Sequence, residues 1–246
     1  MGSSIKSPTY TESLYELLSG GGEMGEIIRS YNWAATPLGP VSGWPQSLLT
    51  TLSILLGSQY PMFLWWGNDL IQFYNDAYRP SLGVEGKHPK ALGQKAIDCW
   101  PEVWSVIKPL IDQVLNGEPS VWSEDQLIPI YRNGKLEDVY WTFSFSPVKV
   151  EDGSIGGILV VCTETTSKVV TFKKLMESED QLRFAIEATE LGTFDYDPIA
   201  DAFKSNNRLK DWFGLPANSE IPLALTIDSI AEHDKQRVKD GIQTAL

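Results

Sequence analysis

The chain has 246 residues, which is enough for one large domain or for two modules of about 100 residues each. Its formal net charge is −12 and it has no basic stripe, which excludes a typical nucleic-acid-binding surface, because phosphate contacts need clustered lysine and arginine. The two cysteines, Cys99 and Cys162, form no CxxC or Cys/His pattern, so no metal site is predicted. No apolar run reaches about 18 residues and no signal-peptide core is present, so we expect a cytoplasmic segment.

The N-terminal part, residues 1–57, predicts a lead-in followed by a leader helix. Residues 1–22 end in three consecutive glycines and are expected to be mobile. After Pro45, leucines recur at helical spacing over residues 46–56, and Gly57 ends the pattern. Such an apolar helix needs a surface to cover.

Two apolar runs, residues 61–66 and 70–74, flank a Gly-Asn-Asp step and therefore predict a hairpin. The first run is apolar on both faces, which for a strand indicates cover on both sides. Trp65 and Trp66 are neighbours in this run and must point to opposite faces. One indole should pack on internal helices and the other on the leader helix or a dimer partner.

Residues 75–119 predict short helices and then a longer one over residues 103–115, which has an apolar stripe. Three strands are predicted next, over residues 121–131, 136–150 and 155–163, with Asn133-Gly134 as the first turn. The middle one of these alternates, with Val139, Trp141, Phe143 and Phe145 on one face. The predicted fold class is α+β: a five-stranded antiparallel sheet with helices on one face, in which the first and last strands are adjacent.

Several stretches resemble PAS domains of bacterial sensor histidine kinases. The segment "PMFLWWGNDLIQFYNDAYRP" resembles the opening of these domains, and "HPKALGQKAIDCWPEVW" is similar to their middle helices. Residues 121–166 are similar to the three closing strands, and "TPLGPVSGWPQSLLTTLSILLGS" resembles the leader that precedes them. The resemblance implies a PAS domain over residues 58–166.

A second, shorter resemblance begins at Leu182, where "LRFAIEATELGTFDYDPIADAFKSNNRLKDWFGLPANSE" is similar to the start of another PAS domain. The run from His233 to Arg237 partly matches the family's His-Pro-Asp-Asp-Arg sequence. Residues 188–246 are therefore expected to be a second PAS domain, truncated before its last three strands.

Residues 167–187, between the two modules, predict a helical signalling linker. Apolar residues recur there about every 3.5 positions, at Phe172, Leu175, Met176, Leu182 and Ile186. The spacing predicts a short coiled coil of two chains, or alternatively a single amphipathic helix packed on its own domain.

The resemblance implies a pocket in the first PAS domain. Our pocket candidates, for a planar or apolar ligand, are Phe73, Cys99, Trp100, Trp104, Trp141 and Phe143. The alternative is a packed aromatic core. The cofactor is unknown, and the sequence requires none. A flavin photosensor of this family would have its thiol at Ala96, three residues before Cys99, and a haem-binding one would have a histidine within 103–115. His88 lies in a glycine-rich loop and is expected to be solvated.

No catalytic set is present, since the sequence has no phosphate-binding glycine loop and no Ser/His/Asp arrangement, so this chain is predicted not to be an enzyme. The resemblance implies a sensory and dimerisation input region of a two-component histidine kinase, relaying a signal through the linker to a downstream kinase domain. Expected partners are a second copy, through the leader helix, PAS sheet face or linker helix, and a small-molecule ligand. The alternatives are a flavin- or haem-binding light or redox receptor, and an input to a cyclase or phosphatase.

Overall fold

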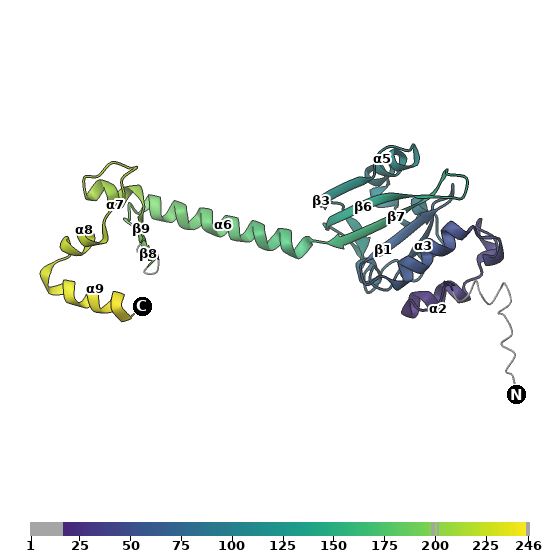
Figure 1. Cartoon of the computed structure of the whole chain (residues 1–246), viewed down its shortest axis with the longest axis horizontal. Coiled ribbons are helices and arrows are strands. Elements are labelled where there is room, and N and C mark those ends of the chain that lie inside the picture. Colours follow the sequence, from purple (N-terminus) through teal and green to yellow (C-terminus); the bar gives the residue numbers. More distant parts are fainter. Residues whose placement is uncertain (1–16, 198–199, 201, 245–246) are drawn as a thin grey trace, which may run out of the picture. The chain divides into compact units, whose positions relative to one another are not determined.

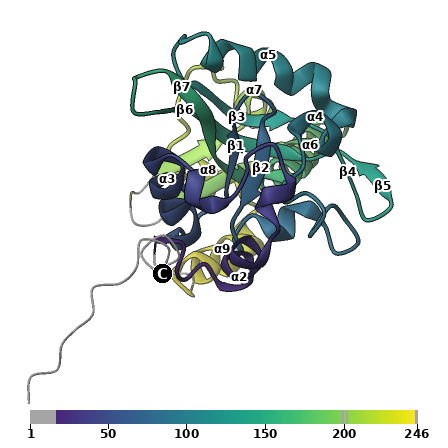
Figure 2. The ribbon, with the colours of Figure 1, turned by 90° about the vertical axis from the view of Figure 1, so that its right-hand side faces the viewer.

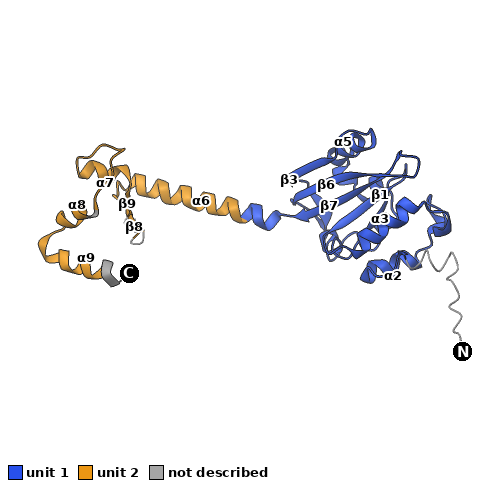
Figure 3. Ribbon diagram, in the orientation of Figure 1, with its two compact units in different colours: residues 1–170 blue, residues 171–246 orange. Residues whose placement is uncertain are grey.

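A computed structural model describes residues 17–197, 200 and 202–244. The chain forms two compact units, residues 1–170 and 171–246 (Figure 1, Figure 3). The boundary falls inside helix α6, Thr166–Ala188. Most of the expected lead-in, residues 1–16, lies outside the described residues, but Leu18 at its end is fully buried. The end of that lead-in is therefore part of the core rather than mobile.

The first unit is built on a five-stranded antiparallel sheet in the order β2-β1-β7-β6-β3. Its strands are β1 (Met62–Trp66), β2 (Ile71–Tyr74), β3 (Val121–Leu127), β6 (Tyr140–Lys149) and β7 (Ile155–Glu164). The predicted hairpin is confirmed, because β1 pairs with β2, and β1 also pairs with β7. The first and last strands of this unit, β1 and β7, thus lie side by side inside the sheet. This position explains why both are apolar on both faces.

Helices cover both faces of this sheet. Helix α5 (Trp104–Leu115) and the short α4 (Ala96–Cys99) lie on one side, and α3 (Gln46–Gly57) lies on the other (Figure 1, Figure 2). Helix α3 packs with buried leucines at positions 48, 49, 52, 55 and 56. Burying one leucine contributes about 1.5–3 kcal/mol, so α3 is held to the sheet by several such contributions. The leader helix therefore covers its own sheet.

Asn75 explains why the second apolar run stops where it does. Its side chain is buried at the end of β2 and makes five hydrogen bonds to backbone groups. The amide nitrogen donates to the carbonyl oxygens of Leu55 (3.1 Å), Ser58 (3.2 Å) and Tyr60 (2.8 Å), and the amide oxygen accepts from the backbone N–H groups of Met62 (3.0 Å) and Tyr78 (3.0 Å). One residue thus joins the end of α3, the start of β1 and the turn after β2, with no polar atom of its amide unpaired.

The closing strands differ from the prediction in one respect. The predicted strand 121–131 is broken after Leu127, and the predicted strand 136–150 begins the main sheet only at Tyr140. The residues between form a separate ribbon of β4 (Ile130–Arg132) and β5 (Lys135–Glu137), which projects beside the sheet (Figure 2). Pro129 lies at the break, and proline has no N–H to continue a ladder. The Asn133-Gly134 turn is as predicted, with φ of 53° and 75°.

The leader forms an aromatic cluster on the α3 side of the sheet, which we call the leader cluster. Helix α2 (Gly22–Ser30) precedes Trp33, whose indole stacks on Phe73 with ring centroids 4.7 Å apart. The Trp44 ring meets Phe73 edge-on at 5.7 Å. Such aromatic pairs add about 0.5–1.5 kcal/mol beyond burial.

The second unit begins within α6 and continues with a hairpin and three helices. Its elements are β8 (Phe194–Asp197), β9 (Ala202–Ser205), α7 (Asn207–Trp212), α8 (Leu223–Asp228) and α9 (Glu232–Thr244). The Asn206 side chain caps α7 by accepting from Leu209 N–H at 3.0 Å. Within the described residues, no helix is both long enough and apolar enough to cross a bilayer.

Candidate functional site

A cavity of about 60 Å³ lies on the face of the sheet that α5 covers, which we call the inner face. Its wall is almost entirely apolar, and aromatic rings make up much of it. The lining residues are Phe63, Trp65, Tyr78, Trp100, Val103, Ile107, Ile128, Ile130, Trp141, Phe143, Phe145, Val160 and Cys162. They come from β1, β4, β6 and β7, from the helical stretch that ends with α5, and from the connecting segments at Tyr78, Trp100 and Ile128. These segments are far apart in the chain.

The structure brings together three of the six predicted pocket residues. Trp100, Trp141 and Phe143 lie on the wall. Phe73 does not, because it faces the leader cluster on the opposite side of the sheet. Trp104 begins α5 and packs half-buried against the edge of the core. Whether any of these residues contacts a ligand stays a prediction.

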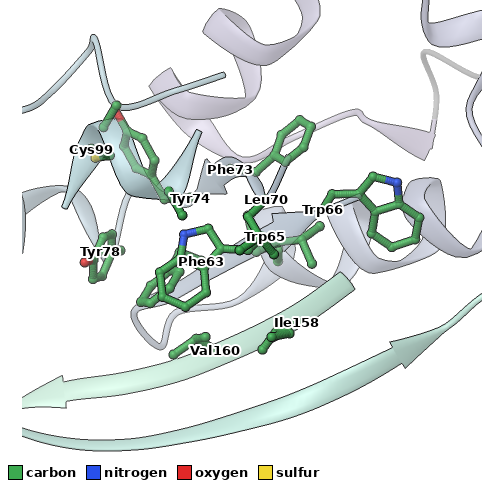
Figure 4. Packing of buried hydrophobic residues seen from close by; sticks show 14 of the residues in the cluster. Phe63, Trp65, Trp66, Leu70, Phe73, Tyr74, Tyr78, Cys99, Ile158 and Val160 are labelled. Carbon is green, nitrogen blue, oxygen red and sulfur yellow. The ribbon is translucent and has the colours of Figure 1, made fainter. Parts of the chain in front are cut away.

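The two adjacent tryptophans of β1 point to opposite faces, as predicted (Figure 4). Trp65 lines the cavity and meets Phe145 edge-on, with ring centroids 5.5 Å apart. Trp66 is buried on the other face, where its ring lies against the backbone of Gly157. The inward residues of β1 are therefore Phe63 and Trp65, and the sequence analysis missed both as pocket residues although the period of two would have indicated them.

Gln72 is a fully buried amide in β2 that fixes two of the cavity-lining indoles. Its Oε1 accepts hydrogen bonds from Trp65 Nε1 at 3.0 Å and from Trp100 Nε1 at 2.6 Å. Its Nε2 donates to the sulfur of Cys99 at 3.6 Å. Cys99 is thus held beside Gln72 rather than on the cavity wall, and burial raises the pKa of its thiol to about 12, so it is not a reactive thiolate at neutral pH.

The residues around the cavity do not fit a flavin or a haem. Pockets for drug-sized ligands measure about 300–1,000 Å³, whereas this cavity measures about 60 Å³. The lining contains no histidine, and burial raises the pKa of its only thiol, Cys162, which disfavours a thiolate ligand. Among the described residues there is also no group of three or more side chains arranged to hold a metal ion.

His88 is not solvated, contrary to the expectation from its loop. Its side chain is only 16% exposed, and it lies between two partners from different elements. His88 Nδ1 is 2.8 Å from the Tyr74 hydroxyl and Nε2 is 3.4 Å from Glu23 Oε1. The histidine thereby connects β2 with helix α2. Burial raises the pKa of Tyr74, so its hydroxyl stays protonated.

Lys87 and Glu102 connect the cavity wall to the β4–β5 ribbon. The Lys87 ammonium lies 4.5 Å from the centre of the Trp100 ring and 2.8 Å from Glu102 Oε1. The same carboxylate oxygen accepts a hydrogen bond from the backbone N–H of Tyr131 at 2.9 Å. Trp100 and the ribbon are thus linked through a charged pair that is largely buried.

Arg132, the next residue of the ribbon, binds the end of strand β7. Its guanidinium makes two hydrogen bonds of 2.9 Å to the two carboxylate oxygens of Glu164, the final residue of β7. It also donates to Glu137 Oε2 at 2.8 Å and to the Ser81 carbonyl at 3.0 Å. The hydrogen bond from Arg132 lowers the pKa of Glu137. A bidentate pair of this kind fixes orientation as well as distance.

The first turn of α6 is held by a second ion pair. Lys168 Nζ lies 2.9 Å from Asp125 Oδ2 and 3.3 Å from Glu124 Oε1. Asp125 sits at an irregularity in the β3–β6 ladder and has a left-handed φ of 49°. The neighbouring Thr165 hydroxyl and the Lys168 ammonium lower the pKa of its carboxyl group. We refer to Arg132, Glu164, Asp125 and Lys168 as the exit junction.

The predicted linker residues all lie on α6, and none of the residues of this helix is buried. Phe172 and Leu182 are each 62% exposed, and Leu175 is 54% exposed. Met176 is also exposed, and Ile186 is partly so.

Comparison with known proteins agrees with this architecture. Residues 69–170 match the family model described as PAS fold, and the first unit has that fold. No curated protein matches the chain.

Similar solved structures include a sensory box sensor histidine kinase from Vibrio cholerae, with 22% identity, 48% of this chain and 87% of that chain covered, and a TM-score of 0.32. The PAS domain of Bordetella pertussis BvgS has 16% identity, 55% and 98% coverage, and a TM-score of 0.39. An RNA-binding light-oxygen-voltage receptor has 18% identity, 61% and 42% coverage, and a TM-score of 0.38.

Proposed function

We propose that this chain is the non-catalytic sensory and dimerisation input region of a bacterial two-component histidine kinase. Its PAS domain receives a signal and passes it through α6 to a downstream kinase, in the cytoplasm. Residues 188–246 belong to a second PAS domain. An input to a cyclase or phosphatase would use the same relay and differ only in the output domain.

One observation carries this proposal: a continuous set of contacts joins the cavity wall to the start of α6. The contacts pass from Trp100 to Lys87 and Glu102, then to the β4–β5 ribbon, and from Arg132 to Glu164. Glu164 is two residues before α6. In the relay, these contacts shift together between two states of the domain.

The exposed apolar side of α6 supports the dimerisation part of the proposal. Two exposed leucines and a phenylalanine at heptad-like spacing favour pairing with a second copy. A coiled coil of two to three heptads is short, so it needs additional contacts. The outer sheet face offers one candidate, since Trp122 on β3 is 66% exposed there. The leader helix is a weaker candidate, because its leucines already cover its own sheet.

The test fuses the whole chain to a histidine kinase output domain and changes the phase of α6. Insertions of three or four residues after Glu179 rotate the following helix relative to the preceding part, whereas an insertion of seven residues nearly restores the heptad phase. We expect the short insertions to change autophosphorylation severalfold and the seven-residue insertion to leave it close to the starting level. Equal output from all four proteins would contradict the relay.

A further inference from the structure

The outer face of the sheet, opposite the cavity, is covered unevenly. Helix α3 packs on β1 and β2, where the outward side chains of Leu64 and Trp66 are 0% and 5% exposed. On the half formed by β7, β6 and β3, the outward residues are only half-buried or exposed, and Trp122 on β3 is 66% exposed. This half of the outer face is therefore open in a single copy of the first unit.

Strand register aligns four outward side chains in one row across the open half. Met62 on β1 pairs with Val161 on β7. Val161 also pairs with Ser144 on β6, and Ser144 pairs with Trp122 on β3. All four face away from the cavity, because each is adjacent in sequence to an inward, buried residue. Neighbouring strands are about 4.8 Å apart, so the row crosses roughly 14 Å of the sheet.

No side chain in or beside this row is charged, although charged residues make up 21% of the chain. The outward residues of β6 and β7 around the row are threonine, serine, leucine and valine, at Thr142, Ser144, Ser146, Leu159, Val161 and Thr163. We refer to these six residues, together with Met62 and Trp122, as the outer strip. The central parts of protein interfaces are depleted in charge in the same way.

The composition of the outer strip favours a second copy of this chain as its partner. The net charge of −12 makes two copies repel one another, so they need an uncharged face to meet. The strip is also self-complementary in size, because bulky Trp122 lies beside the small side chains of β6. In a two-fold pair the same patch is present on both sides, so each tryptophan can lie over the small residues of the other copy.

The outer strip is also continuous with the start of α6. Its last residue on β7 is Thr163, and α6 begins at Thr166. Lys168 in the first turn of α6 pairs with Glu124 and Asp125, which follow Trp122 on β3. Charged groups therefore border the strip at this end, as they do at the rim of an interface.

We propose that a second copy of this chain packs on the outer strip about a two-fold axis, with Trp122 of each copy over Thr142, Ser144 and Ser146 of the other. The inference rests on the dimerisation part of the proposed function and names the surface that forms the contact. The strip has fewer residues than the roughly 20–30 per side of a standard interface, so it acts together with α6. Tryptophan in the centre of such a contact typically carries much of the binding energy.

The test measures the dimer dissociation constant of the full chain by sedimentation equilibrium. The strip variants are Trp122→Asp and Ser144→Arg, each of which places a charge in the strip, and their urea unfolding shows whether they are folded. Val106→Asp is the matched control, because Val106 is an apolar residue that is 42% exposed on α5, which covers the inner face. Leu182→Asp tests the apolar side of α6 separately.

We expect the dissociation constant to rise at least about thirtyfold in Trp122→Asp and in Ser144→Arg, and to stay within about threefold of the wild-type value in Val106→Asp. Either strip variant decides by itself if the other does not fold. A dimer that is weakened by Leu182→Asp but by neither strip variant would overturn the outer strip and leave dimerisation standing. A wild-type chain that is monomeric at every concentration would overturn both, and the insertions in α6 test the relay separately.

Discussion

Replacing Gln72 by methionine should destabilise the first unit, because the amide accepts from two buried indole N–H groups. Methionine has a similar length and offers no comparable acceptor, so the N–H groups of Trp65 and Trp100 lose the partner that they have at 3.0 Å and 2.6 Å. A buried donor without a partner costs about 1–3 kcal/mol. Two such donors, partly offset by the apolar side chain, give an expected loss of about 3 kcal/mol in the free energy of unfolding.

The assay is urea unfolding followed by tryptophan fluorescence. Eight of the nine tryptophans lie in the first unit, at positions 33, 44, 65, 66, 100, 104, 122 and 141, so the signal reports mainly on that unit. Gln126→Met is the matched control, because Gln126 is exposed on β3. The free energy of unfolding of this control should stay within about 0.5 kcal/mol of the wild-type value.

A double mutant separates the hydrogen bonds from general packing. Trp100→Phe removes one of the two donors, so its cost should be smaller in the Gln72→Met background than in the wild type, with a coupling energy of about 1 kcal/mol. If Gln72→Met unfolds at the same urea concentration as the wild type, the two indoles do not depend on this amide and the reasoning is refuted.

Three further predictions concern the exit junction and the cysteines. Arg132→Gln should speed amide hydrogen exchange at the start of α6, because the bidentate pair with Glu164 is lost; exchange at the wild-type rate would count against the junction. The pKa of Asp125 is lowered in the fold, so its contribution to stability is present above the unfolded pKa and is lost as pH falls below about 4. Asp125→Asn should remove this part of the acid sensitivity in thermal unfolding scans, and an unchanged profile would contradict it. Iodoacetamide at pH 8 should label Cys99 and Cys162 only after denaturation, because both are buried and their thiol pKa values are raised; rapid labelling of the native protein would disprove their burial.

The candidate site shows where sequence reasoning reached its limit. Trp100, Trp141 and Phe143 were predicted as pocket residues, and all three line the cavity. Phe73 was equally plausible from composition, but pairing Trp65 with Gln72 turns Phe73 to the opposite face. A shift of one residue in the assumed register exchanges every inward side chain for an outward one. Tyr78, in a turn after β2, belongs to no periodic pattern and was therefore not predicted.

The sequence by itself determined the order of the five strands of the main sheet and of the helices that cover it, but not the separate β4–β5 ribbon. Local periodicity indicated these elements. It is seen in the strands that are apolar on both faces, in the alternation over residues 139–145 and in the leucines of α3. Tertiary structure alone decided which side chains meet. Arg132 and Glu164 are 32 positions apart, and no local pattern connects them. They pair because the β4–β5 ribbon projects beside the end of β7, and such a juxtaposition depends on strand pairing across the whole sheet rather than on any short stretch of sequence.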